Sequence, residues 1–117
     1  MQGATVELIE SHCETYYVDV FEPDGSPADL SSAQAFFHLM EFSTRDHIWT
    51  KACEPVLDVR AAAQGAAFPS TVPVHFAGGD TLGLDGHYTG QLELVDHNGG
   101  SKFPLQVELI VNKRASR

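Results

Sequence analysis

The sequence predicts an all-β fold, an antiparallel β-sandwich of seven or eight short strands, and three observations support this prediction. Apolar and polar residues alternate with a period of two in one segment after another, as they do in strands with one buried face. Clusters of Gly, Pro, Asn and Asp separate these segments. The one stretch with helical composition, Ala61–Ala67, is too short for a stable helix and is expected to be a one-turn connector. A β-barrel is the alternative arrangement of the same strands.

The clearest element is a β-hairpin between Leu84 and Val111. Its two strands place one set of residues on a common dry face: Tyr88, Gly90, Leu92 and Leu94, then Phe103, Leu105, Val107, Leu109 and Val111. Asn98-Gly99 between the strands tolerates the positive φ angles of a tight hairpin turn.

The entrance to this hairpin predicts the type of sandwich. Leu84, Gly86 and Tyr88 have the spacing of a tyrosine corner, in which a Tyr near the start of a strand bonds back to the preceding loop. The predicted sandwich is therefore immunoglobulin-like. Gly90 stands two residues after the corner, where an immunoglobulin domain has its second disulfide Cys, so the usual inter-sheet disulfide is expected to be missing.

The other strands follow from shorter alternating runs. They are expected at Val6–Glu10, Glu14–Phe21, Ala33–Phe42, Cys53–Arg60 and from Val72 to Phe76. Glu22–Pro27 has turn residues throughout, and the mostly polar Ser43–Lys51 is expected to be a hairpin loop. Pro73 cannot donate to a strand ladder, so its segment is expected at a sheet edge or at a strand end. The length and the lack of a linker predict one domain, residues 1–112, with a short basic tail, residues 113–117.

The strand Ala33–Phe42 is unusual because neither of its faces is polar. If Ala33, Ala35, Phe37 and Leu39 face the core, the outward residues are Gln34, Phe36, His38, Met40 and Phe42. Such a strand is either covered on both sides, here by a loop or the tail, or part of an exposed patch that contacts another protein. We favour a protein interface formed by Phe36, His38, Met40 and Phe42, with Trp49 from the following loop.

Composition narrows the possible functions. The 117 residues include 16 acidic and 7 basic side chains, a formal net charge of −9, and such a surface repels phosphate backbones. Nucleic-acid binding is therefore not expected. No apolar run is long enough to cross a membrane, and Met1–Glu7 lacks the pattern of a signal peptide, so neither membrane insertion nor export is expected.

No motif in the sequence predicts catalysis, a metal or a cofactor. Six histidines lie in separate segments, with no spacing that brings two of them together: His12, His38, His47, His75, His87 and His97. Cys13 and Cys53 have no C-x-x-C spacing and are expected to be free thiols. There is no Ser or Cys on a strained glycine turn, and a sandwich of this length has little room for a deep pocket. We therefore expect no enzyme activity and no small-molecule substrate.

Several motifs, taken in order, resemble the small immunoglobulin-like domain of tailed-phage structural proteins, best known at the N-terminus of baseplate upper proteins. The likeness lies in Asp24–Leu39, Asp58–Gly65, Gly79-Asp80-Thr81, Gly86–Tyr88 and Val95–Gly99. Two departures fall on or beside the strand Ala33–Phe42. Ser31-Ser32 replaces the usual Thr-Gly, and Phe36 and Met40 are apolar where the family often has polar residues.

The resemblance implies a non-enzymatic structural or adaptor role in a virion, in a tail, baseplate, neck, fibre attachment or head decoration. It implies that the partners are other virion proteins and copies of this chain, and that the protein is assembled into the virion in the host bacterial cytoplasm. The alternative is a carbohydrate- or host-receptor-binding module. For that function the candidate residues are Tyr17, His47 and Trp49, which are polar or aromatic side chains on or beside loops.

Overall fold

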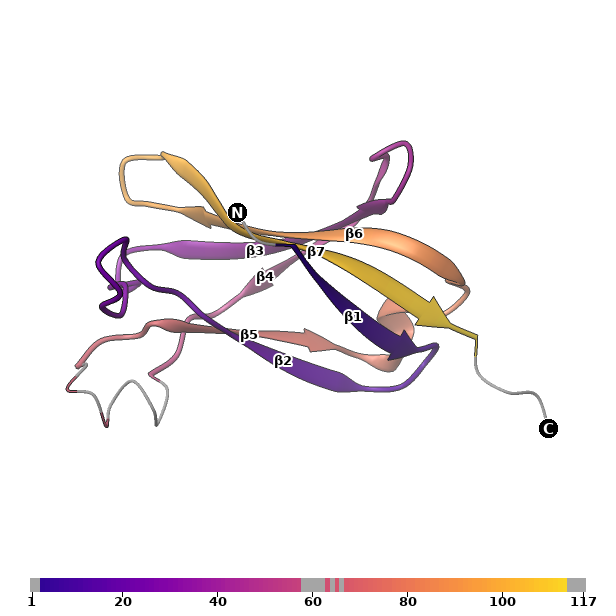
Figure 1. Ribbon diagram of the computed structural model, residues 1–117, viewed down its shortest axis with the longest axis horizontal. Coiled ribbons are helices and arrows are strands. Elements are labelled where there is room, and N and C mark those ends of the chain that lie inside the picture. The colour runs from indigo at the N-terminus through magenta and orange to yellow at the C-terminus, as the bar shows by residue number, and fades with distance from the viewer. Residues whose placement is uncertain (1–2, 58–62, 64, 66, 114–117) are drawn as a thin grey trace.

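The protein is described by a computed structural model that covers residues 3–57, 63, 65 and 67–113. Within these residues the chain forms seven strands and one short 3-10 helix (Figure 1). In chain order they are β1 (Gly3–Ile9), β2 (Glu14–Asp19), β3 (Gln34–Glu41), β4 (His47–Cys53), β5 (Thr71–Phe76), η1 (Gly78–Asp80), β6 (Gly86–Val95) and β7 (Ser101–Asn112).

The strands form two layers, as Figure 1 shows, so the predicted all-β sandwich is confirmed and the barrel is not formed. The larger sheet has the order β1-β7-β6-β3-β4, and the smaller sheet pairs β2 with β5. One pair departs from the antiparallel prediction, because β1 runs parallel to β7 with Gly3 opposite Gln106. Each strand of the smaller sheet has a free edge, as expected for Pro73 in β5.

The core lies between the two layers and is built from the alternating residues of the facing strands. Its members include Ala35, Phe37, Leu39, Val72, Val74, Phe76, Tyr88, Leu92, Leu94, Val107, Leu109 and Val111. Phe37 and Phe76 meet edge to face, with ring centroids 5.7 Å apart and an interplanar angle of 87°. The register assigned from the sequence to Ala33–Phe42 and to the first strand of the hairpin is the register observed.

The turn before β6 holds Tyr88 in the way that a tyrosine corner requires. Its hydroxyl accepts a hydrogen bond from the Asp85 amide at 3.0 Å and donates one to the Asp85 carbonyl at 3.2 Å. Gly86 has φ of 111°, a conformation that L side chains rarely adopt, so the corner needs glycine there. Leu84 packs against the core from the same turn.

The structure corrects three predictions. The segment Ser43–Lys51 is not a loop, because β4 begins at His47 and pairs with β3. A register shift between Leu39 and Met40 hides the alternation of β4 in the sequence. The strand predicted at Cys53–Arg60 is not formed over its described part, where Val56 makes only an isolated bridge to Thr71, and residues 58–60 lie outside the described residues. Most of the predicted connector, Ala61–Ala67, also lies outside them.

The third correction concerns Phe103 in β7. The sequence placed its side chain on the dry face, but it is 43% exposed. The pairing of β6 with β7 shifts between Leu92 and Leu94, so the alternation that holds for Leu105 to Val111 does not continue to Phe103. Its ring instead borders a surface cleft.

Candidate functional site

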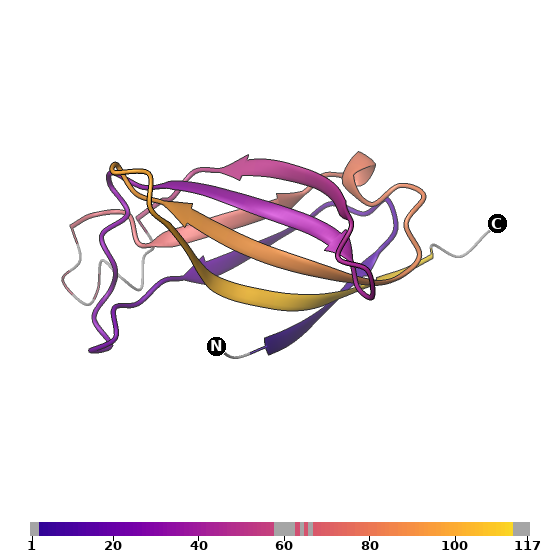
Figure 2. The same cartoon turned by 90° about the horizontal axis from the view of Figure 1, so that it is seen from above.

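The candidate site is the side of the larger sheet that points away from the core, called the outer face below. Cross-strand pairing assigns its residues, because directly paired residues share a face. They are Thr5, Glu7 and Ile9 of β1; Phe36, His38 and Met40 of β3; His47, Thr50 and Ala52 of β4; His87, Thr89, Gln91 and Glu93 of β6; and Gln106, Glu108 and Ile110 of β7. Figure 2 looks onto this sheet, and no described segment passes over it.

Apolar and polar side chains are mixed on the outer face. Phe36, Met40 and Ile110 are half-buried by their neighbours. Phe42, just beyond β3, is 48% exposed and lies with its ring centroid 5.9 Å from that of His87. Ile9 at the end of β1 is 44% exposed. The outward placement of Phe36, His38, Met40 and Phe42 is thus the one expected from the sequence.

A chain of hydrogen bonds crosses four strands of the larger sheet, β4, β3, β6 and β7, and centres on His38. Its Nε2 lies 2.7 Å from Glu93 Oε1, and its Nδ1 lies 2.7 Å from Thr50 Oγ1. The same hydroxyl lies 2.7 Å from His47 Nε2, while Ser101 Oγ donates to the other oxygen of Glu93 at 2.7 Å. The Ser101 and His38 hydrogen bonds hold the pKa of the Glu93 carboxyl below its usual range.

The donor and the acceptor of each of these hydrogen bonds follow from the negative charge of Glu93. An ionised carboxylate can only accept, so Nε2 of His38 is the donor. In neutral imidazole the other nitrogen then accepts, so the Thr50 hydroxyl donates to Nδ1 and accepts from His47 Nε2. The network therefore fixes one tautomer for each ring while both are neutral.

This network was not predicted from the sequence, which gave no spacing that brings two histidines together. Pairing of β3 with β4 does so, because His38 lies opposite Thr50 and Met40 lies opposite His47. The two imidazole centroids are 6.4 Å apart. Only knowledge of the strand pairing, with its register shift, could have revealed the contact.

Hydrogen bonds link the Thr50 hydroxyl, the His38 imidazole and the Glu93 carboxylate in that order, as in hydrolase triads. The surroundings of this hydroxyl, however, differ from those of a catalytic nucleophile. Thr50 is exposed on an open sheet, and the two cavities described in the structure, of about 380 and 400 Å³, include neither Thr50 nor His38. Among the described residues, no group of three or more His, Cys, Asp or Glu could hold a metal ion.

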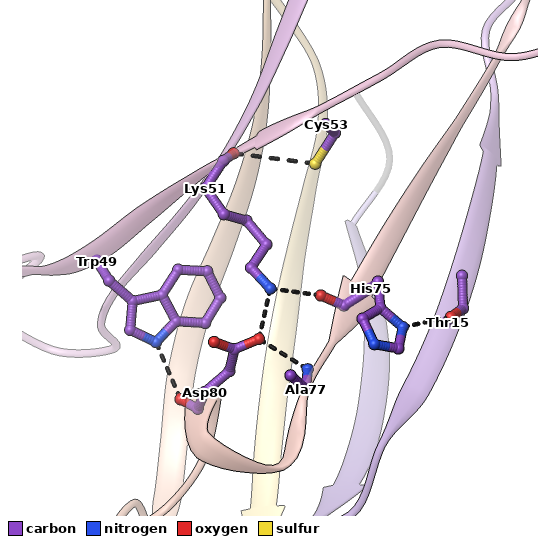
Figure 3. Close-up of polar contacts among 7 residues, drawn as sticks. All are labelled: Thr15, Trp49, Lys51, Cys53, His75, Ala77 and Asp80. Atoms are coloured by element: carbon purple, nitrogen blue, oxygen red, sulfur yellow. Dashed lines mark hydrogen bonds and ion pairs between the residues drawn. The ribbon is translucent and has the colours of Figure 1, made fainter.

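Trp49 does not belong to the outer face. It lies opposite Leu39 on the inward side of β4, with its ring centroid 6.2 Å from that of Phe76, and its indole N–H donates to the Asp80 carbonyl at 3.0 Å (Figure 3). The interface predicted from the sequence grouped it with Phe36 and Phe42, but these residues lie on opposite sides of the sheet. Trp49 was predicted to lie in a loop, and its position in a strand explains the difference.

Lys51 ties the two sheets together beside Trp49. Its ammonium group contacts the Asp80 carboxylate, donates to the His75 carbonyl at 2.5 Å and lies 5.5 Å from the centroid of the Trp49 ring (Figure 3). The Asp80 carboxylate also accepts from the Ala77 amide at 2.7 Å. This cluster joins β4 to β5 and η1, so its contacts account for a charged residue on the inward side of a strand.

A cleft of about 380 Å³ opens at the end of the molecule where β7 begins. Its apolar lining includes Phe21, which is 56% exposed, together with Phe103 and Leu30. Asp29 and Asp96 also line it, but their carboxylates accept hydrogen bonds within their own turns, from Ser31 and from the Asn98 and Gly100 amides. No local pattern in the sequence indicates this cleft, because its walls come from distant segments.

The two cysteines and the membrane prediction can also be compared with the structure. Cys13 and Cys53 are free thiols, and burial raises the pKa of the Cys53 thiol, which makes it a weaker nucleophile at neutral pH. In the part of the chain that the structure describes, no helix has the length and apolar character needed to span a membrane.

Comparison with known proteins defines the class of the fold. No family model matches the sequence, and no curated protein matches it either. The structure is similar to the fibronectin(III)-like modules of Clostridium thermocellum CbhA, with a TM-score of 0.50 and 10% sequence identity, over 98% of this chain and 94% of that chain. At this identity the likeness shows the fold alone. The chain is therefore an immunoglobulin- or fibronectin-III-like β-sandwich module.

Proposed function

We propose that this chain is a non-enzymatic structural or adaptor module that docks other proteins through its outer face. The observation that supports this proposal is an open sheet face on which apolar side chains stand among hydrogen-bonded polar ones. Phe42 and Ile9 expose 48% and 44% of their surface, and Phe36, Met40 and Ile110 are partly accessible on the same face. Protein interfaces combine an apolar centre with a polar surround in the same way.

The polar part of the outer face is ordered before any partner arrives. His38, Thr50 and Glu93 are held by cross-strand hydrogen bonds, and His87 is held by Glu108 on β7. A side chain that is already fixed loses less conformational entropy on binding, which lowers the free-energy cost of association. A sheet face with side chains already fixed in this way favours a rigid contact that is repeated in many copies.

The setting that we propose is a tailed-phage particle, and this part rests on the sequence resemblance. In a symmetric particle a modest interface occurs in many copies, so avidity compensates for weak single contacts. Its partners are then other virion proteins and copies of this chain. Immunogold labelling of particles made by the strain that encodes the chain tests the setting. Label at one fixed position on the particle supports it, and particles without label contradict it.

A second function, ligand binding, is favoured by the cleft between Phe21 and Phe103 rather than by the residues expected from the sequence. Trp49 is turned inward, whereas these two phenylalanines are exposed in a cavity of a size that small molecules occupy. A glycan array probed with the wild-type chain and with Phe103→Ala tests this function. Signal that the substitution removes would favour the cleft over the outer face.

A further inference from the structure

Among the described residues of the outer face, only the histidines can carry a positive charge. Of the described basic residues, Lys51 is turned inward to Asp80, Lys102 lines the cleft, Lys113 follows β7, and Arg45 lies in the turn between β3 and β4. The titratable groups of the face are three imidazoles and three carboxylates: His38, His47, His87, Glu7, Glu93 and Glu108.

The charge of the face therefore depends on how many of its imidazoles carry a second proton. With neutral imidazoles the three carboxylates give three negative charges. With three imidazolium groups the net charge is zero, and the face then carries equal numbers of both signs. Histidine in general gains its proton between about pH 7.5 and 5.5.

Each histidine has neighbours that determine how it responds to protonation. His38 faces Glu93 from β6 and His47 from β4, and its second proton would meet Thr50, which now donates to that nitrogen. His87 faces Glu108 from β7, and the ring of Phe42 lies beside it.

The other titratable groups of the face, His47 and Glu7, have the following neighbours. His47 faces His38 and the Thr50 hydroxyl, and Asp46 precedes it in the chain. At the β1 edge, Glu7 accepts a hydrogen bond from the Asn112 side chain at 3.3 Å. Protonation thus adds positive charge beside two existing carboxylates and forces the Thr50 hydroxyl to change its hydrogen-bond direction.

We propose that the outer face is a pH-controlled self-association surface, and that its occupant is the outer face of a second copy of this chain. This rests on the proposed function, because it names a partner for the same surface. While the imidazoles are neutral, two such faces, each with three negative charges, repel one another. Once the histidines are protonated, a two-fold axis can set imidazolium groups of one copy against carboxylates of the other. Phe42 and Ile9 then supply apolar area to the contact.

Light scattering of the purified chain at pH 7.5, 6.5 and 5.5, at fixed ionic strength with reductant, tests this proposal. We expect a monomer at pH 7.5 and a dimer at pH 5.5, with the dissociation constant falling at least about tenfold, which corresponds to about 1.4 kcal/mol. The double variant His38→Gln/His87→Gln should stay monomeric at pH 5.5. Far-UV circular dichroism verifies that each protein remains folded at each pH.

A matched control separates this effect from the general loss of charge near the isoelectric point, pI ≈ 4.8. His12→Gln/His97→Gln removes two imidazoles from turns that lie off the outer face, and so changes the net charge equally. This control should dimerise like the wild type.

Three outcomes would overturn the proposal: a mass that does not change with pH, dimers that persist in the His38/His87 variant, or dimers lost in the control. If any of these occurs while an outer-face substitution still blocks incorporation into particles, the outer face docks a different protein and the proposed function stands.

Discussion

Replacing Gly90 with alanine tests how tightly the core is packed at the centre of β6. A Cβ atom at this position would lie 2.4 Å from Cζ of Phe37 and 3.0 Å from Cδ1 of Leu109. Both neighbours are buried, with exposed fractions of 3% and 1%. The ring of Phe37 therefore occupies the space that a side chain would need. The same position holds a disulfide Cys in immunoglobulin domains, whereas here an aromatic ring packs over glycine.

The expected cost follows from overpacking. An extra methyl group in a well-packed core forces side chains from their preferred rotamers and costs about 1 to 3 kcal/mol. The unfolding entropy of globular proteins, about 2.1 cal/mol/K per residue, gives about 0.25 kcal/mol/K for a chain of this size. Gly90→Ala should thus lower the thermal midpoint by about 4 to 12 °C.

The assay is thermal unfolding followed by circular dichroism, with Gln91→Ala on the outer face as the matched control. That control should change the midpoint little, because surface substitutions usually stay within about 0.5 kcal/mol. Phe37→Leu combined with Gly90→Ala should be more stable than the sum of the single effects predicts, because the smaller side chain leaves room for the methyl group. A midpoint for Gly90→Ala equal to that of the wild type would refute the packing argument.

Three further substitutions have expected effects on stability. Tyr88→Phe removes two hydrogen bonds to the Asp85 backbone and should cost about 1 kcal/mol in chemical denaturation, whereas Tyr17→Phe at an exposed position should cost nothing measurable. Asp80→Ala removes the acceptor of the Ala77 amide and leaves the Lys51 ammonium group with only the His75 carbonyl, so it should lower the free energy of unfolding by about 1 to 2 kcal/mol; an unchanged value would show that the Lys51–Asp80 contact contributes nothing. The pKa of Glu93 is lower in the folded than in the unfolded chain, so its contribution is present above about pH 4.3 and is lost as the pH falls through the folded value. Glu93→Gln should therefore flatten the loss of stability below about pH 4.3, and an acid titration with the wild-type slope would contradict this assignment.

Much of the fold could be predicted because the signals were local. The alternation in Ala33–Phe42, the Asn98-Gly99 turn and the Leu84, Gly86, Tyr88 spacing each depend on residues close together in the chain. The alternation and the corner place their residues on the predicted side of the strand, and the turn lies at the predicted position, although the pairing of β6 with β7 shifts close to it.

What could not be predicted depends on pairing between distant strands. The alternation of β4 is broken by the register shift between Leu39 and Met40, so its polar residues were assigned to a loop. Lys51 was assigned to the end of a loop, and its contact with Asp80 gave no local signal because the two residues are distant in sequence. The contact of His38 with His47 through Thr50 likewise exists only once β3 and β4 are paired. The candidate site was therefore predicted in its β3 residues and missed in those of its neighbours.

The central claim, docking through the outer face, is tested most directly by the incorporation of Phe42→Asp into particles. The variant chain replaces the wild type in cells that assemble the particle, and the fraction of chain in purified particles is measured. Tyr17→Asp is the control, because Tyr17 is an aromatic that is 62% exposed and lies on β2 of the other sheet. We predict that the Phe42→Asp chain is folded, with the thermal midpoint of the wild type, and absent from particles, while the control is incorporated. Incorporation of Phe42→Asp at the wild-type level would contradict the account.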